Sequence, residues 1–354
     1  TSEVTLNAYV MPLVKQYLTS LEHELNSIGI KAPLYIMQSN GGMTTPENAM
    51  ARPIEIIECG PAAGVVGATR LSGHSDSSLI TFDMGGTTAK ASIVEEGQVS
   101  HAREYEVGGG LNRASRLLKG SGYVVRVASI DIAEIGAGGG SILKIDAGGG
   151  VAIGPESAGA NPGPACYGLG GILPTIADAD LVLGYINPKH LCGGTYPLNS
   201  GEAEKALASD IAPALGLDII EAAYGIYQLA NARMMRAIKS VSSERGRDPR
   251  KFSLHAFGGA GPVHAAGVAK GLGMNCIVIP PAPGVFSAFG LLTGNIERHF
   301  SRSFSRPWDK SSLAEANSII DDLESEARST MSLWAGKDWD NELSINRLLD
   351  LQYD

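Results

Sequence analysis

Two glycine-rich segments contain the residues whose types and spacing best suit chemistry. The first is Phe82–Thr88 (FDMGGTT), in which an aspartate ends an apolar run and two glycines and two threonines follow. Glycine lets backbone approach a ligand closely, and successive N–H groups in a tight turn attract anions such as phosphate. Asp83 at the strand end can hold a magnesium ion, directly or through water. The alternative is an ordinary glycine hairpin.

The second segment is His255–Pro262 (HAFGGAGP), which reads as a strand, a glycine loop and a helix with proline in its first turn. The N-terminus of such a helix offers free N–H groups and a favourable dipole, both of which suit a nucleotide. Many strand-to-helix turns are glycine-rich, so this segment alone is a weak signal.

Hydrophobic periodicity predicts the elements that must position these segments. The expected helices are 3–29, Pro61–Leu71 (rich in small residues and tightly packed), 219–245, Pro262–Gly271 and an amphipathic 313–334. The expected strands are Pro33–Ser39, Leu79–Phe82, Ala89–Val94, Gln98–Val107 and a buried Cys276–Ile279. Between about 108 and 200 the chain is irregular and glycine-rich, which we interpret as an ordered insertion built from loops.

The order of these pieces resembles the second subdomain of the actin, sugar kinase and heat-shock chaperone ATPase fold. There, a connecting helix (here with Pro61-Ala62-Ala63) precedes a second phosphate loop, and an adenosine loop comes much later. The expected fold class is therefore α/β, an actin-like (ribonuclease H-like) subdomain with a large glycine-rich insertion. The resemblance implies two sets of ATP-binding residues: Asp83, Gly85, Gly86, Thr87 and Thr88 facing the phosphates, and Gly258, Gly259, Ala260 and Gly261 facing the adenosine.

A more specific resemblance spans the chain from Asn7 to about Glu297. The strings MQSNGGMTT, GPAAGVVGA, FDMGGTTAK, GAGGGSI, IGPESAGANPGPACYG and FGGAGPVHA are similar to the hydantoinase A/oxoprolinase family. This resemblance implies ATP-dependent phosphorylation of a carbonyl or amide oxygen, with Mg2+ or Mn2+ as the metal. It also implies a hydantoinase B-like partner subunit and a small cyclic amide or ketone as substrate.

Three functions remain open at this stage. The first is a subunit of an ATP-dependent cyclic amidohydrolase that activates a lactam or imide for ring opening. The second is a ketone carboxylase subunit of the acetone or acetophenone type, which bicarbonate-dependent turnover would identify. The third is a nucleotide-regulated binding module of the chaperone class, which would bind ATP without stimulation of hydrolysis by a small substrate.

The resemblance also predicts the domain organisation. Family members normally begin with a domain that carries a first phosphate loop, and no such motif precedes Thr1, so we expect a piece of a larger subunit that is inactive alone. The expected parts are 1–58 (end of the first actin-like subdomain), 59–107 with 219–300 (second subdomain), 108–218 (substrate-side insertion) and 301–354 (start of a C-terminal region).

Several single residues remain ambiguous. Lys90 follows the phosphate hairpin and is equally well interpreted as a phosphate contact or as a lysine on the strand face. Asp131, Glu134 and Asp178 lie among glycine loops, where oxygen donors would suit a hard metal ion. Their alternative interpretation is as solvated carboxylates or helix caps.

Two histidines and one cysteine are expected to take no part in catalysis. His255 and His264 flank the adenosine loop and are expected to be structural or surface residues. Cys166 lies in the family-specific PGPACYG stretch, where no activating base is nearby, so we expect a packed thiol and not a nucleophile.

Composition narrows the class of protein. The 354 residues carry a net charge of -9, with 44% hydrophobic and 18% charged residues, which is typical of a globular chain and argues against nucleic acid or anionic membranes as partners. No apolar run approaches the roughly 20 residues of a membrane span. Four cysteines without metal-ligand spacing suit free thiols in a reducing cytoplasm.

Overall fold

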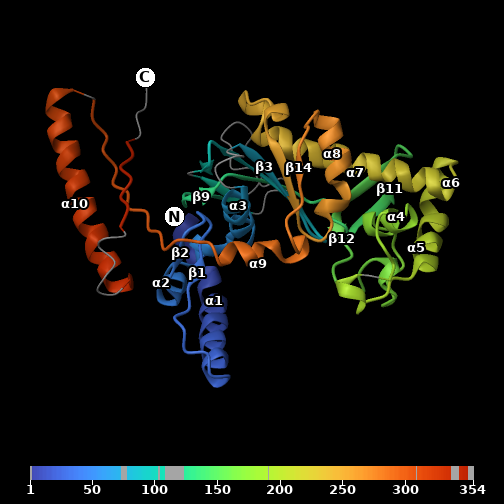
Figure 1. The fold of residues 1–354 in the computed structure, drawn as a ribbon, viewed down its shortest axis with the longest axis horizontal. Coiled ribbons are helices and arrows are strands. Elements are labelled where there is room, and N and C mark those ends of the chain that lie inside the picture. Colours follow the sequence, from blue (N-terminus) through green and yellow to red (C-terminus); the bar gives the residue numbers. More distant parts are fainter. Residues whose placement is uncertain are drawn as a thin grey trace.

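In the computed structural model of the chain, the described residues are 2–72, 78–102, 104–107, 123–189, 191–307, 309–335 and 343–349. A mixed sheet lies at the centre, with helices on both sides of it (Figure 1). The lobe that contains α4 to α6 lies at one end of the molecule, and α10 stands apart at the other. Every helix of the described residues is too short or too polar to cross a bilayer.

The central sheet has the strand order β10-β4-β3-β13-β14. β10, β4 and β3 are antiparallel neighbours, whereas β3, β13 and β14 run parallel. If these five strands are numbered by their order in the chain, the sheet has the order 3-2-1-4-5, which is that of the ribonuclease H-like fold. The expected fold class is therefore confirmed. The strands are β3 (Leu79–Met84), β4 (Ala89–Glu95), β10 (Ile132–Ile135), β13 (Ser253–Phe257) and β14 (Ile277–Val278), with β5 (Gln98–Val99) paired to β4.

Successive side chains of a strand point to opposite faces of the sheet, so the strands contribute to a hydrophobic core on each face. On one face, Ile80 and Phe82 pack with α7 (Ile219–Val241) and α8 (Gly261–Leu272). On the other face, Leu79 and Phe257 pack with α3 (Cys59–Ser72) and α9 (Phe286–Leu291). The strands that carry the glycine segments are therefore held between two layers of helices.

The helix α3 packs as tightly as its small residues predict. A Cβ added at Gly67 would lie 2.9 Å from the Cα of Gly290 on α9, and a Cβ added at Gly64 would lie 2.5 Å from the ring of Phe257. Both positions need glycine because the neighbouring backbone or ring occupies the space. The remaining predicted helices also form, as α1 (Ser2–Ser27), α7, α8 and α10 (Lys310–Ala335).

Two strand predictions are wrong in part. The stretch expected as one strand over 98–107 is broken, because β5 stays on β4 while β6 (His101–Ala102) pairs with β9 (Ser129–Ile130) and β7 (Tyr105–Val107) pairs with β8 (Tyr123–Val125). The strand expected to be buried at Cys276–Ile279 is the two-residue β14. It lies at the sheet edge, where Ile277 is 39% exposed.

The segment 108–218 is more regular than a loop-built insertion, although its residues 108–122 lie outside the described ones. Its strand β10 belongs to the central sheet. Its other elements are β8, β9, β11 (Ser141–Ile145), β12 (Val151–Ser157), α4 (Ile176–Val182), α5 (Ser200–Ala206) and α6 (Ala212–Leu215). Near the N-terminus, β1 (Ile36–Met37), β2 (Met43–Thr44) and α2 (Pro46–Ala51) follow α1.

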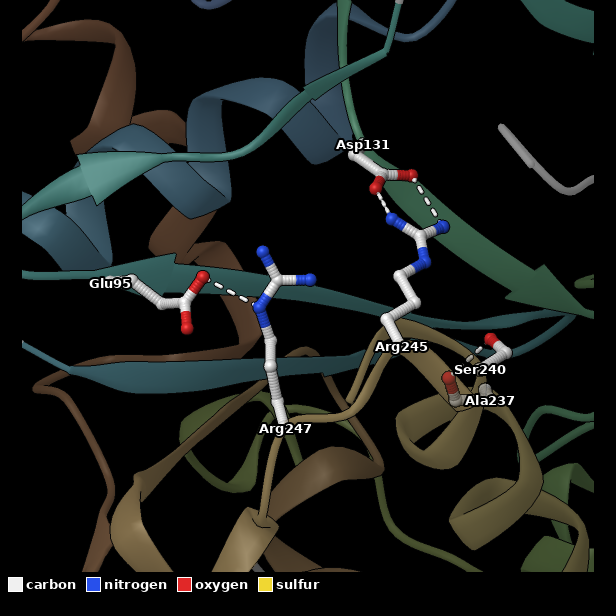
Figure 2. Close-up of polar contacts among 6 residues, drawn as sticks. All are labelled: Glu95, Asp131, Ala237, Ser240, Arg245 and Arg247. Atoms are coloured by element: carbon white, nitrogen blue, oxygen red, sulfur yellow. Dashed lines mark hydrogen bonds and ion pairs between the residues drawn. The ribbon is translucent and has the colours of Figure 1, made fainter. Parts of the chain in front are cut away.

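Two ion pairs attach the connection between α7 and β13 to the sheet (Figure 2). Arg245 forms two hydrogen bonds to Asp131, one of them from Nη2 to Oδ1 at 3.1 Å, and the Asp131 side chain is only 4% exposed. Arg247 donates from Nε to Glu95 Oε2 at 2.6 Å, but Glu95 is 42% exposed. The carboxylate of the first pair is buried, whereas both side chains of the second pair are partly exposed.

This difference in burial predicts unequal stabilities for two matched variants. Arg245→Ala should lower the free energy of unfolding by about 3–5 kcal/mol, because it leaves the buried Asp131 carboxylate without its cation. Arg247→Ala should cost at most about 1 kcal/mol, the range for exposed pairs. Chemical denaturation of both variants checks the prediction, and equal losses would contradict it.

Candidate functional site

The glycine segment after β3 forms a tight turn into β4. The Gly85 N–H donates to the Thr88 carbonyl oxygen at 3.1 Å, which closes the turn. Gly86 and Thr87 at its tip are exposed. The predicted hairpin therefore forms and presents its backbone and its threonines outward.

The second glycine segment lies directly against this turn. Gly258 has a φ of +81°, and a Cβ added there would lie 2.4 Å from the Met84 carbonyl oxygen and 2.5 Å from Asp83 Oδ1. The Ala260 N–H donates to the same Met84 carbonyl oxygen at 2.9 Å. The helix α8 then begins at Gly261 without a side-chain cap. The structure thus brings the two predicted segments together, although they are far apart in the sequence.

A third glycine loop, Gly136–Ser141, completes the cluster. The Gly139 N–H donates to the Gly85 carbonyl oxygen at 3.0 Å, and the Gly140 N–H donates to the Gly86 carbonyl oxygen at 2.7 Å. A Cβ added at Gly138 would lie 2.5 Å from the Thr87 nitrogen. From the sequence, this loop was recognised only as part of the family motif GAGGGSI. The signal that could have placed it at the site is the cluster of four glycines among the five residues that follow the mostly buried strand β10.

Charged side chains form a row beside the turn. Lys90 on β4 is the cross-strand partner of Asp83 on β3 and of Glu134 on β10. Its Nζ lies 2.8 Å from Glu134 Oε1 and donates to Thr88 Oγ1 at 2.8 Å. Burial raises the pKa of the Asp83 carboxyl, and the positive charge of Lys90 partly offsets that rise. The turn is therefore bordered by the partly buried carboxylate of Asp83 and by Lys90, which is held by Glu134 and Thr88.

The carboxylates expected to share a metal ion do not come together. Asp131 is bound by Arg245, and Glu134 is bound by Lys90. Among the described residues, no group of three or more His, Cys, Asp or Glu side chains is placed to hold a metal ion. The metal site predicted at Asp131, Glu134 and Asp178 is therefore not formed, because protein cations and N–H groups already satisfy these carboxylates.

Asp178, the third of them, is a helix cap. It accepts hydrogen bonds from the Thr175 N–H at 2.9 Å and from Thr175 Oγ1 at 2.8 Å, and with Thr175 it forms a capping box at the start of α4. Its other oxygen accepts from the Cys166 N–H at 2.7 Å. Cys166 itself is fully buried, and burial followed by the nearby Asp178 charge raises the pKa of its thiol. The expected packing of this thiol is confirmed.

The two histidines near the second glycine segment are buried. His255 on β13 is 2% exposed, and His264 on α8 is 0% exposed. Nδ1 of His264 lies 2.8 Å from Asn231 Oδ1, and its Nε2 lies 3.2 Å from Asp180 Oδ2. Their structural interpretation is confirmed.

The three glycine loops, Lys90 and the uncapped start of α8 make a surface suited to an anion. Backbone N–H groups of tight turns and the positive end of a helix dipole favour phosphate. Asp83 is the one carboxylate among the predicted phosphate-facing residues. Mg2+ typically takes one or two protein carboxylates, substrate phosphates and several waters. These residues therefore fit a magnesium ion that arrives with a nucleotide.

Comparison with known proteins supports this interpretation. An uncharacterised protein of Methanocaldococcus jannaschii is 42% identical over 354 residues, which are 100% of this chain and 51% of that protein. The structure of the ATP-dependent caprolactamase from Pseudomonas jessenii superimposes with a TM-score of 0.71 at 32% identity, covering 93% of this chain and 46% of the other. Nucleotide-free acetone carboxylase superimposes with a TM-score of 0.73 at 26% identity, covering 92% and 45%.

The chain spans about half the length of these relatives. The sequence profile described as hydantoinase/oxoprolinase matches residues 1–299, which include all three glycine loops. With the sheet order and the site geometry in agreement, the chain belongs to the hydantoinase/oxoprolinase family.

Proposed function

We propose that this chain is the nucleotide-binding part of an enzyme subunit that uses ATP to open a cyclic amide. The observation that carries the proposal is the convergence of three glycine loops beside Asp83 and Lys90. This arrangement offers N–H groups, a cation and a carboxylate to a nucleotide. The chemistry it supports is transfer of a phosphoryl group to the substrate.

The residues have separate roles in this proposal. The N–H of Gly86 and the hydroxyls of Thr87 and Thr88 bind the phosphates, while Gly85, whose own N–H closes the turn, shapes the backbone that presents them. Lys90, held by Glu134, places its positive charge near the transferred group. The loop Gly258–Gly261 and the first turn of α8 face the adenosine. Positioning and neutralisation of charge dominate catalysis of phosphoryl transfer, so no covalent enzyme intermediate is needed.

Asp83 is the residue that would hold Mg2+ when the nucleotide is bound. The metal would supply neutralisation of the negative charge on the phosphate oxygens. Asp83 lies at the end of β3, where Gly258 packs against its carboxylate and Lys90 is its cross-strand partner. These contacts hold the carboxylate in place before the ligand arrives.

Phosphorylation explains why ring opening would require ATP. The carbonyl oxygen of the lactam attacks the γ-phosphorus, and ADP leaves. The O-phosphorylated carbon is more electrophilic than the amide carbon, so water adds to it. Cleavage of the ring C–N bond then gives an open acyl phosphate, and a second water hydrolyses it to the amino acid and inorganic phosphate. The balance is one ATP and two waters consumed for each ring opened.

A ketone carboxylase is the second candidate, and a specific observation favours it. The chain superimposes on acetone carboxylase as well as on caprolactamase, with TM-scores of 0.73 and 0.71. Both reactions would begin with phosphorylation of a carbonyl oxygen at the same nucleotide residues. Substrate class is then decided outside the glycine loops. In either case we expect the full-length subunit to act with a hydantoinase B-like partner.

The test is ATP hydrolysis by the full-length subunit together with its partner. We expect hydantoin, 5-oxoproline or caprolactam to stimulate ADP release without bicarbonate, with one ADP formed per ring opened. Stimulation only by acetophenone or acetone with bicarbonate would assign the protein to the carboxylases. Absence of ATP consumption with every lactam and ketone would refute both candidates.

Replacing Asp83 by asparagine should lower the ATPase activity without lowering the stability of the fold at neutral pH. Asp83→Asn should lower ATP hydrolysis by about 100-fold or more, the scale for removing one preorganised electrostatic group. Burial raises the pKa of Asp83, so its stabilising contribution is present below the ordinary aspartate pKa and lost as pH rises through the folded pKa. At neutral pH the variant should therefore be as stable as the wild type or more stable.

Thermal unfolding at acidic and neutral pH, beside steady-state ATPase assays, checks this prediction. The exposed ion-paired Asp322 on α10 supplies the control, since Asp322→Asn should change neither quantity. A marked loss of stability in Asp83→Asn at neutral pH would contradict the account of this carboxylate.

A further inference from the structure

A closed ring of hydrogen bonds connects the glycine loops through a buried histidine. Two of its links are at the turn: Gly139 N–H to the Gly85 carbonyl oxygen at 3.0 Å, and Ala260 N–H to the Met84 carbonyl oxygen at 2.9 Å. A third link joins the loop to α4, because the Ala177 N–H donates to the Gly139 carbonyl oxygen at 2.7 Å. These three links connect backbone to backbone.

The fourth link closes the ring and is made by side chains. One turn after Ala177, Asp180 Oδ2 on α4 lies 3.2 Å from Nε2 of His264 on α8. His264 is one turn after Ala260, so α8 carries the ring back to Met84. The two helices are 84 residues apart in sequence at this contact. The His264–Asp180 pair is thus the link of this ring that substitution of side chains can remove.

The pair is rigidly held. Both side chains are essentially inaccessible, at 0% and 1% exposure. The ring of Tyr227 stacks on His264 with centroids 5.1 Å apart, and Asn231 contacts the other imidazole nitrogen at 2.8 Å. Oδ1 of Asp180 has no hydrogen-bond partner within the described residues, so this carboxylate depends on the contact between its Oδ2 and His264. Removing His264 would leave a buried carboxylate unsupported, which is costly.

The backbone of α8 lies close to the α7 side chains that contact His264. A Cβ added at Gly267 on α8 would lie 2.3 Å from Asn231 Nδ2 on α7 and 2.8 Å from the Tyr227 hydroxyl. Helices α7 and α8 therefore meet at close range beside the histidine. A displacement of α4 relative to α8 would have to break the His264–Asp180 contact.

We propose that His264 and Asp180 are positioning residues that set the distance between the adenosine loop and the loop Gly136–Ser141. The proposal rests on the nucleotide-binding function proposed above. Neither side chain needs to touch the nucleotide. Their contact fixes α4 against α8, and the backbone links transmit that placement to the turn Gly85–Gly86, so all three loops meet the ligand in one geometry.

The experiment compares two buried polar contacts in the full-length subunit with its partner. His264→Ala and Asp180→Ala break the ring, whereas Arg245→Ala breaks the buried pair with Asp131 on another part of the sheet. All three should lower the melting temperature. We expect only the ring variants to raise the KM for ATP, by about tenfold or more, because small misplacements of binding groups are costly.

Two further variants separate positioning from general damage. Asp180→Asn keeps an oxygen facing His264 and should hold the KM for ATP within about threefold of the wild type. If His264→Ala does not fold, His264→Gln and Asp180→Ala carry the same test at a temperature below their melting points. A KM that stays at the wild-type value in the ring variants, or that rises equally in Arg245→Ala, overturns the inference. A wild-type enzyme without ATP turnover overturns the proposed function first.

Discussion

Close contact between backbones is the constraint on which the site depends. Around the turn Gly85–Gly86, the chain returns twice, at Gly138 and at Gly258, and comes so near that a Cβ at either position would lie about 2.5 Å from backbone atoms of the turn or its flanks. Such distances are possible only for glycine. The surface that results is made of peptide groups, which suits an anionic ligand and leaves little room for side-chain chemistry.

The sheet explains why three distant loops meet at one point. β3, β4, β10 and β13 are neighbours in it, and β3, β10 and β13 run in the same direction. The turn after β3, the loop after β10 and the loop after β13 therefore all emerge at the same end of the strands. The same adjacency places Lys90 between Asp83 and Glu134 by cross-strand register. The fold supplies the geometry, and the glycines allow the approach.

Sequence reasoning identified what is local in this design. The hairpin Phe82–Thr88 and the loop Gly258–Gly261 have short-range signals, namely glycines at the end of apolar runs and a proline in the first helical turn. The ribonuclease H-like fold followed from the order of such segments. The tight packing of α3 followed from its small residues, and Gly67 and Gly64 bear it out.

Most of the misses depend on contacts between residues far apart in the sequence, although Asp178 is a local helix cap. The carboxylates of Asp131 and Glu134 looked like metal ligands because their cations could not be seen: Arg245 is 114 residues away from Asp131, and the Lys90–Glu134 pair requires the register of β10 on β4. Strand β10 was hidden in a segment judged irregular from its glycines. The stretch 98–107 is broken because three of its parts pair with three different strands, β4, β9 and β8, which local propensity does not reveal.

The central claim is that the three glycine loops bind one nucleotide together. Amide hydrogen exchange of the full-length subunit, with and without a non-hydrolysable ATP analogue and Mg2+, tests it most directly. The account predicts that residues 83–88, 136–141 and 258–261 gain protection together and at the same analogue concentration. Protection of only one of these segments, or of none while the nucleotide is bound, would contradict it.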